Sequence, residues 1–475
     1  MLEAVSARPV RAFVPAASSS MQRTSHRPAP PAAAGQAAAA APAGRRGSVA
    51  AAAAAPSAAA PAPILPEVPA GTKNVVVLGG TGRVGASTAA ALAAAVPSAR
   101  LSLAGRSDES FREAVARRPE LSAASPLRCD IDDPSSLAAA LKGADLVVHA
   151  AGPFQRRSDC TVLEAAIAAG VPYMDVCDDT EYSQRAKALH AKAQAAGVPA
   201  ITTGGIYPGV SNVMAAHMIS LNGGEYNEDG SYAEQPPEGA PRPKRLLYSY
   251  FTAGTGGAGP TIMETTLLLA GEDVVAYKDG KRVALPPVSN KRMVDFGAGV
   301  GRRSVYLYNL PEVTSGHQVF GVPNVSARFG TFPDPWNWGM VAAARLLPKS
   351  VLSDRQQTRG VARALDPLVR SVDGLVGEKV AMLVEVEYDN DKTAAALYVH
   401  PRLSEAVGTC TAAFAWCMLA GQTQPGVWFP EERGALGDRR ALLGAASQGA
   451  ARFLVNRPPW SLETEPVQLG LGFYL

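Results

Sequence analysis

The residues best suited to chemistry begin with a glycine-rich segment, Gly79-Gly80-Thr81-Gly82-Arg83-Val84-Gly85. An apolar run precedes it and an alanine-rich stretch follows it, as expected for a strand, a turn and a helix. In such a unit Gly80 permits the tight turn, Gly82 lets the backbone approach a pyrophosphate, and Gly85 lets the helix pack closely on the strand. Free N–H groups at the helix start hold the anion. We therefore predict a dinucleotide phosphate site here; a glycine-rich turn without a ligand is the alternative.

An arginine stands where the choice between the two nicotinamide cofactors is made. The second expected strand ends at Leu103-Ala104-Gly105-Arg106, where an NAD site usually places a carboxylate that accepts from the ribose 2′-hydroxyl. A guanidinium pairs well with a 2′-phosphate, so Arg106 favours NADP(H) over NAD(H), with Arg83 as a second positive contact. Asp108 and Glu109 lie just beyond and keep the NAD alternative open.

Two further segments are expected to border the cofactor. Asp130 and Ile131 follow the third expected strand, where this fold places the adenine, while Asp133 fits the cap of the next helix. The segment Ala150-Ala151-Gly152-Pro153 follows the fourth expected strand. Small residues there let the backbone pass close to the ribose and nicotinamide, and Pro153 stiffens the loop.

Four residues are candidates for managing a proton during hydride transfer, which is the cofactor's own chemistry. Asp175, Cys177 and Asp178 close the fifth expected strand, at the edge where parallel strands present their carboxyl ends to a ligand. Tyr207 lies in a glycine-rich turn and could donate to a nitrogen. The structural alternatives are that Asp179 caps the next helix, that Cys177 fills the core and that Tyr207 is an interface aromatic.

Two features would suit a substrate carboxylate. The turn Gly204–Asn212 leads into an expected helix, so its glycines and N–H groups could bind an anion. Arg302 and Arg303 could clamp a dicarboxylate, although adjacent residues of a strand point to opposite faces, so at most one faces a site. The sequence leaves both features open.

The elements that position these residues alternate between apolar strands and helices. Strands are expected at Asn74–Leu78, Arg100–Ala104, Leu127–Asp130, Asp145–Ala150, Pro172–Cys177 and Pro199–Thr203. Helices are expected at Ala86–Ala95, Glu109–Arg118, Pro134–Leu141, Asp159–Ala169 and Glu181–Ala196. This alternation predicts an α/β fold, a Rossmann doubly wound parallel sheet with strand order 3-2-1-4-5-6.

The rest of the chain has a different pattern. Strands are expected at Lys244–Phe251, Val294–Phe296, Ser304–Tyr308, Ala381–Tyr388 and Ala394–Val399, without regular helices between them. This predicts a second, mixed α+β sheet domain. We expect a leader at 1–70, the Rossmann NADP-binding domain at 71–222, a flexible insertion at 223–243, a mixed-sheet substrate or dimerisation domain at 244–402, and a C-terminal helix and tail at 403–475 that pack back on the first domain.

Composition and charge exclude several classes of protein. Formal net charge is +3 over 475 residues, but six arginines against Glu3 alone give residues 1–66 a charge of +5, which leaves −2 for the remainder. Nucleic-acid binding by that remainder therefore has no electrostatic support. The five cysteines form no CxxC pair, which argues against a zinc site or a disulfide scaffold, and no apolar run is long enough for an integral membrane span.

The arginine excess in residues 1–66 belongs to a leader rich in Ala, Pro and Ser and nearly free of acids. That composition is typical of an organelle transit peptide, and the alternative is a disordered tail. The Ser, Ala and Pro bias favours the chloroplast stroma, after removal of the leader, over the mitochondrion.

Several of these motifs resemble the saccharopine dehydrogenase-like family. GGTGRVG, LAGR, CDIDD, HAAGPF, VPYMDVCDD and GGIYPGVSNVMA follow one another at that family's spacing, and GVWFPEE (Gly426–Glu432) resembles its closing motif. The resemblance includes the saccharopine reductase and carboxynorspermidine reductase types, with plastid and cyanobacterial members the most similar. It implies a Rossmann domain, an inserted mixed-sheet domain, and reversible reduction of an imine formed between an amino acid or polyamine and a carbonyl compound. Tyr207 departs from the acidic residue that the saccharopine reductases commonly carry before Pro-Gly.

We therefore expect an NADP(H)-dependent oxidoreductase acting on a C–N centre of a small amino-acid or polyamine-like substrate. The alternative is a catalytically silent NADP(H)-binding sensor or scaffold in the plastid. An extended short-chain dehydrogenase is rejected because it needs Tyr-x-x-x-Lys, whereas Tyr182 and Lys187 are one residue further apart. No metal is expected, and the sequence leaves a homodimer open.

Overall fold

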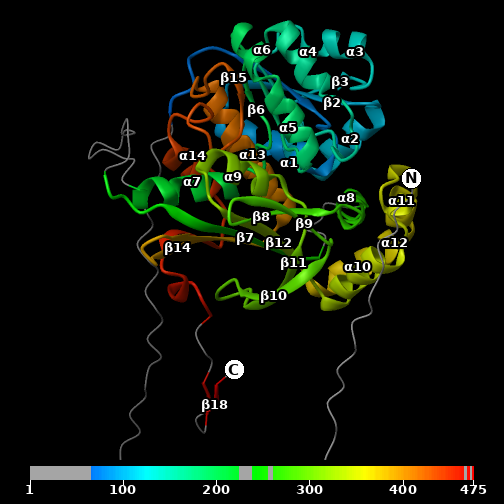
Figure 1. Ribbon diagram of the computed structural model, residues 1–475. Coiled ribbons are helices and arrows are strands. Elements are labelled where there is room, and N and C mark those ends of the chain that lie inside the picture. Colours follow the sequence, from blue (N-terminus) through cyan, green and yellow to red (C-terminus); the bar gives the residue numbers. More distant parts are fainter. Residues whose placement is uncertain (1–65, 224–237, 255–259, 465–467, 471–472, 475) are drawn as a thin grey trace, which may run out of the picture. The chain divides into compact units, whose positions relative to one another are not determined.

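The computed structural model describes residues 66–223, 238–254, 260–464, 468–470 and 473–474 (Figure 1). Most of the predicted leader at 1–70 lies outside the described residues, as does most of the predicted insertion at 223–243.

The first sheet is parallel, and its strands are arranged in the order β15-β6-β5-β4-β1-β2-β3. The strands are β1 (Lys73–Leu78), β2 (Ala99–Gly105), β3 (Ser125–Arg128), β4 (Leu146–His149), β5 (Tyr173–Asp175), β6 (Pro199–Ile201) and β15 (Gly426–Trp428). The predicted order 3-2-1-4-5-6 is confirmed. Strand β15, which comes from the C-terminal region, adds an edge strand parallel to β6 that the sequence pattern did not predict.

Helices cover both faces of this sheet, because its strands are apolar on both sides. They are α1 (Arg83–Ala95), α2 (Asp108–Arg117), α3 (Pro134–Leu141), α4 (Thr161–Ala169), α5 (Thr180–Ala188) and α6 (His190–Ala195), with a 3-10 turn at Pro119–Leu121. Helices α1 and α2 pack on one face, and α3 to α6 on the other. The helix predicted over Glu181–Ala196 is in fact two helices that meet at Leu189.

The second sheet is mixed and has the order β10-β11-β12-β7-β13-β14-β16, with β8 and β9 paired beside β12. Its strands are β7 (Pro243–Ala253), β8 (Val274–Lys278), β9 (Lys281–Leu285), β10 (Ser289–Asp295), β11 (Arg302–Leu307), β12 (Asn324–Phe332), β13 (Lys379–Tyr388), β14 (Thr393–His400) and β16 (Arg452–Arg457). Strands β7 and β12 are parallel, whereas the other neighbours are antiparallel. A short hairpin, β17 (Gln468–Gly470) and β18 (Phe473–Tyr474), is separate from it.

The expectation of no regular helices between the strands of 244–402 is wrong. This region contains α8 (Pro260–Ala270), α9 (Pro311–Phe320), α10 (Asp334–Leu346), α11 (Lys349–Leu352) and α12 (Arg355–Val376). Local chemistry explains α9: Pro311 occupies the first turn, where a missing N–H costs nothing, and Gly321 ends the helix in the left-handed conformation.

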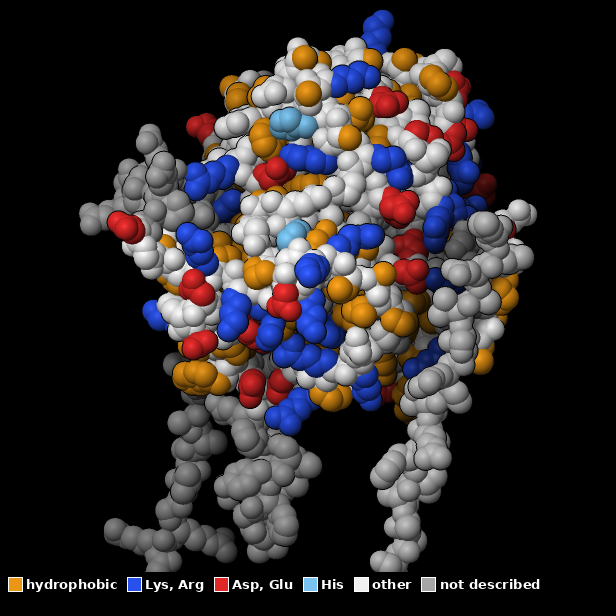
Figure 2. Space-filling model, in the orientation of Figure 1, with side chains coloured by type: hydrophobic (Ala, Val, Ile, Leu, Met, Phe, Trp, Pro, Cys, Tyr) orange, Lys and Arg blue, Asp and Glu red, His pale blue; other side chains and the backbone are white. Residues whose placement is uncertain are grey.

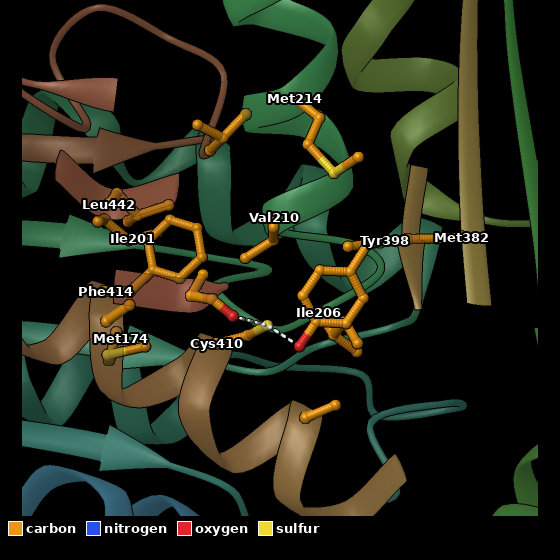
Figure 3. Close-up of a cluster of buried hydrophobic side chains, with 14 of the residues drawn as sticks. Met174, Ile201, Ile206, Val210, Met214, Met382, Tyr398, Cys410, Phe414 and Leu442 are labelled. Atoms are coloured by element: carbon orange, nitrogen blue, oxygen red, sulfur yellow. Dashed lines mark hydrogen bonds between the residues drawn. The ribbon is translucent and has the colours of Figure 1, made fainter. Parts of the chain in front are cut away.

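Two helices join the sheets through one core. They are α7 (Val210–Gly223) and α13 (Leu403–Leu419). A Cβ added to Gly408 of α13 would come within 2.6 Å of Ser87 in α1. The backbones of α13 and α1 are therefore in close contact at this point. Figure 3 shows the shared core, with Cys410 of α13 3.9 Å from the Tyr398 hydroxyl of β14, and with Met174, Ile201, Ile206, Val210, Met214, Met382, Phe414 and Leu442 around them.

The C-terminal region contributes to both sheets. Helix α13 packs on α1 and β15 extends the first sheet, whereas β16 pairs with β14 of the second sheet. Helix α14 (Arg439–Ala446) and a 3-10 turn at Pro459–Ser461 complete this region.

On the face shown in Figure 2, Lys and Arg side chains are interspersed with Asp and Glu side chains. Among the described residues, no helix has the length and apolarity to cross a membrane.

Candidate functional site

The glycine turn between β1 and α1 is built from backbone packed on backbone. The Gly82 amide donates to the Gly79 carbonyl at 2.9 Å, and Gly79 has a φ of +74°. A Cβ added to Gly80 would lie 2.7 Å from the Val77 carbonyl oxygen, and one added to Gly85 would lie 2.8 Å from the Gly79 carbonyl carbon. Side chains are therefore excluded from these positions, which keeps the turn tight and its surface made of backbone.

Helix α1 begins without a side-chain cap from the described part of the chain. Gly82 is its N-cap and supplies no side-chain hydrogen bond, and the first turn carries no acidic residue. The first intrahelical bond runs from the Ala86 amide to the Gly82 carbonyl at 2.9 Å, so the amides of the first turn, at 83–85, have no acceptor within the helix. Uncapped amides and the positive end of the helix suit a diphosphate, so the residues present fit the dinucleotide predicted here.

The predicted adenosine contacts lie along the same edge of the sheet, because β1, β2 and β3 are neighbours in parallel. Arg106 directly follows β2 and is exposed, and no contact holds its guanidinium within the described part of the chain. Thr81 lies against the end of β2, where its side chain approaches within 3 Å of a Cβ added to Gly105. Asp108 and Glu109 instead begin α2 behind the Ser107 cap. This arrangement leaves Arg106 available to a 2′-phosphate.

The remaining predicted cofactor residues follow β3 and β4. Asp130 is exposed and its Oδ1 accepts from the Asp132 amide at 3.0 Å, while Ile131 is partly buried. Ala151 packs its backbone against Gly79 of the glycine turn. Ala150, Gly152 and Pro153 line a cavity of about 240 Å³ that opens beside this turn, together with Val84 of α1.

That cavity lies between the two sheets and is mostly apolar. Its described lining residues come from the glycine turn, the ends of β4 and β5, the turn before α7, the second sheet, α8 and α13: Val84, Ala150, Gly152, Pro153, Phe154, Val176, Asp178, Gly205, Ile206, Tyr207, Pro208, Tyr250, Thr252, Thr265, Thr266, Leu269, Tyr308, Leu310, Phe329, Leu403 and Val407. Asp178 is the single carboxylate among them.

Of the four predicted catalytic residues, Asp178 and Tyr207 line the cavity. Asp178 Oδ1 accepts from Gln155 Nε2 at 2.8 Å, and burial raises the pKa of its carboxyl to about 6. The Tyr207 ring stacks on Tyr250 at a centroid distance of 4.5 Å, and burial raises the pKa of its phenol. A carboxyl with this pKa can exchange a proton near neutral pH.

Asp175 and Cys177 are fully buried and do not belong to the described cavity lining. The Asp175 carboxylate accepts from the amides of Thr203 and Cys177, at 2.8 and 3.0 Å, and from the Tyr173 hydroxyl at 2.9 Å. These bonds tie the end of β5 to the end of β6. The Cys177 thiol faces the Asp179 backbone, and burial raises its pKa well above the ordinary value. Both side chains thus hold the strand ends in place beside Asp178.

Four residues discussed in the sequence analysis have structural roles. Asp179 caps α5, accepting from the Tyr182 amide at 2.6 Å, and Asp133 caps α3. Arg302 pairs with Asp295 at 3.6 Å, and the Arg303 guanidinium stacks on the rings of Phe251 and Phe332. Neither arginine is among the described lining residues of the cavity.

Two buried glutamates behind the cavity were not predicted. Glu312 lies in the first turn of α9, and its carboxyl is buried beside the Tyr250 hydroxyl. Glu431 Oε1 accepts from Asn212 Nδ2 at 2.9 Å, and Oε2 is unpartnered. Burial raises the pKa of each carboxyl to about 7. The charge of Glu431 raises the pKa of Glu312 further, and the charge of Glu432 raises that of Glu431.

The available signals for these glutamates were indirect. Glu431 lies in the closing GVWFPEE motif, and Glu312 follows a proline at a helix start, but neither feature indicates burial. Among the described residues, no group of His, Cys, Asp and Glu side chains could hold a metal ion.

Comparison with known proteins identifies the first domain. Residues 75–201 match the family model of the saccharopine dehydrogenase NADP binding domain. Apo saccharopine dehydrogenase (L-Glu forming) from Saccharomyces cerevisiae superposes with a TM-score of 0.54 at 15% identity, over 81% of this chain and 99% of that chain. Pen from Bacillus thuringiensis matches with a TM-score of 0.22 at 18% identity, over 28% of this chain and 50% of that chain.

These comparisons confirm the predicted cofactor and fold class. The chain binds NADP(H) through its Rossmann domain, and it shares the fold of the yeast enzyme over 81% of its length. An NADP(H) site beside a mostly apolar cavity supports an oxidoreductase.

Proposed function

We propose that this protein is an NADP(H)-dependent oxidoreductase that transfers a hydride to or from a C–N centre in the cavity between its two sheets. The observation that carries the proposal is the position of Asp178. It is a titratable carboxyl in an otherwise apolar lining, and the same cavity is bordered by Gly152 and Pro153, where a nicotinamide is expected. The sequence resemblance to the saccharopine reductase and carboxynorspermidine reductase types supports the C–N chemistry.

Different residues of this chain would bind the cofactor and transfer the proton. The amides at the start of α1 hold the diphosphate and Arg106 pairs with the 2′-phosphate. Bound NADPH supplies a hydride to an electrophilic carbon. When a C=N bond is reduced, its electron pair moves to the nitrogen, which takes one proton. We assign to Asp178, which accepts a hydrogen bond from Gln155, the role of giving that proton and of taking it back in the reverse direction.

A test of this function uses the full chain with NADPH and mixtures of amines and carbonyl compounds that form imines. We expect loss of NADPH absorbance at 340 nm with at least one mixture, and a turnover at least tenfold lower for Asp178→Asn. Glu181→Gln is the matched control, because Glu181 is an exposed acid on α5 that does not line the cavity. Equal turnover of Asp178→Asn and wild type would refute the role of Asp178.

The second candidate is a catalytically silent NADP(H)-binding sensor or scaffold. The observation that favours it is that Asp175 and Cys177, two of the predicted catalytic residues, lie outside the described cavity lining and are engaged in structural bonds. This candidate predicts NADPH binding without turnover for every mixture in the same assay.

The leader supports a further proposal on location, namely import into the chloroplast stroma followed by removal of the leader. Its support is the composition of residues 1–66, with six arginines against one acid. A fluorescent fusion of the full chain should accumulate in plastids, and one that begins at Gly71 should not.

A further inference from the structure

We infer that the substrate of this cavity is a hydrophobic amine, or the imine formed from it, that carries no carboxylate group. The inference rests on the proposed function and narrows its substrate class. Within the described lining, the residues that could recognise a ligand are a carboxylate, aromatic rings and hydroxyls. No Lys, Arg or His is among them.

A buried carboxylate needs a cation or several N–H donors, since transferring it from water unpaired costs many kcal/mol. Three glycine amides of the turn before α7, which was predicted as such a donor site, are engaged within the protein. The Gly204 amide donates to the Asp175 carbonyl at 2.7 Å, and the Gly205 amide donates to the Pro208 carbonyl at 3.2 Å. The Gly209 amide donates to Asn212 Oδ1 at 3.0 Å. This turn therefore offers a substrate carboxylate no anion-binding amides from these three residues.

Three arginines outside the described lining, Arg355, Arg156 and Arg303, have partners within the protein. Arg355 donates to the Pro153 carbonyl at 3.3 Å, so it contacts the backbone of a lining loop without itself lining the cavity. Arg156 lies 3.6 Å from Glu272 in an ion pair, and Arg303 is stacked between two phenylalanine rings. A dicarboxylate substrate would find no cation at the described wall.

The described lining residues of the cavity are suited to a positively charged ligand. Asp178 belongs to this lining, and so do the aromatic residues Tyr207, Tyr308 and Phe329. Aromatic faces and a carboxylate together attract an ammonium group. Glu312 lies directly behind, close enough for its charge to raise the pKa of the Tyr207 phenol.

The same groups would repel an anion. A substrate carboxylate in this cavity would face Asp178 with Glu312 behind it, and like charges at close range in a low-dielectric site are strongly unfavourable. The apolar remainder of the lining, with Val176, Leu269 and Val407, favours hydrocarbon on the amine's substituents. Reduction then adds a hydride to the imine carbon and a proton to its nitrogen, and NADPH is oxidised to NADP⁺.

The test uses two probes that differ in one group: N-benzylmethylamine, and N-benzylglycine, in which a carboxylate replaces a hydrogen of the methyl group. Isothermal titration first measures NADP⁺ binding to the full chain, and then the binding of each probe to the NADP⁺-loaded chain at pH 8. We expect N-benzylmethylamine to bind at least tenfold more tightly than N-benzylglycine. Asp178→Asn should weaken the amine about tenfold, and the exposed-acid variant Asp391→Asn should not change it.

The outcomes separate the inference from the function on which it rests. If NADP⁺ does not bind, the proposed function fails. If NADP⁺ binds and N-benzylglycine binds as tightly as N-benzylmethylamine, or neither probe binds, the inferred substrate class is overturned. An amine affinity that Asp178→Asn leaves unchanged overturns the assignment of Asp178 as the group that receives the ammonium.

Discussion

The substitution Gly85→Ala should disturb the phosphate turn and leave the rest of the protein unchanged. Its new methyl group would lie 2.8 Å from both the Gly79 carbonyl carbon and Gly80 Cα, which are backbone atoms that no rotamer change can move. The turn must therefore open. Forcing one methyl group into a closely packed site costs about 1–3 kcal/mol. Because that turn shapes the diphosphate cradle, the cost should appear as NADPH binding that is about 5- to 150-fold weaker.

The assay is the dissociation constant of NADPH, measured by the change in its fluorescence on binding, together with the melting temperature. Gly339→Ala in α10 is the control, because nothing lies within 4 Å of its added Cβ. An exposed helical Gly replaced by Ala should keep NADPH affinity and raise stability slightly. If Gly85→Ala binds NADPH as wild type does, the close-packed turn is not what holds the diphosphate.

Three further outcomes follow from the same geometry. Arg106→Ala should weaken NADPH about tenfold or more while leaving NADH affinity unchanged, since a charge-assisted bond is worth about 1.5–3 kcal/mol; equal losses would contradict its pairing with the 2′-phosphate. Burial raises the pKa of Glu312 from 4.5 to about 7, so its carboxyl stabilises the fold fully below pH 4.5 and loses that contribution as the pH rises through 7. The unfolding free energy of wild type relative to Glu312→Gln should thus fall by about 3 kcal/mol over that range in denaturant titrations. Asp179→Ala removes the cap of α5 and should lower the unfolding free energy by about 1 kcal/mol without changing NADPH affinity.

Periodicity predicted the first sheet because each of its elements is decided locally. The strands from β1 to β6 are continuous apolar runs, and the helices between them begin at recognisable caps such as Ser107, Asp133 and Asp179. Strand β15 was missed since three residues, Gly426–Trp428, carry no periodicity. It forms only because β6 presents an open edge to the C-terminal region.

The second sheet was predicted less completely because its elements depend on their neighbours. Strand β12 alternates buried and half-exposed residues, a pattern that its parallel pairing with β7 stabilises. Helix α12 carries an internal proline, Pro367, which argues against a helix from sequence alone. These are tertiary preferences that local propensity does not encode.

In the candidate site, too, some residues could be predicted from local sequence and others depend on tertiary contacts. The glycine turn and Asp178 belong to short segments whose chemistry is visible in the sequence, whereas Glu312 and Glu431 are brought together only when α9 and the closing motif meet around α7. Burial, rather than residue type, gives the two glutamates their raised pKa. No spacing rule predicts burial contributed by three separate segments.

The distribution of charge between the two ends of the site supports the substrate inference independently of any one residue. The phosphate end combines open helix amides with Arg106, which suits an anion. The substrate end combines Asp178 with a second layer of carboxyls, Glu312 and Glu431, which suits a cation or a neutral group. Since NADP(H) itself is an anion, a site with opposite preferences at its two ends would hold the cofactor in one orientation. It would also keep anionic metabolites out of the cavity beside the nicotinamide.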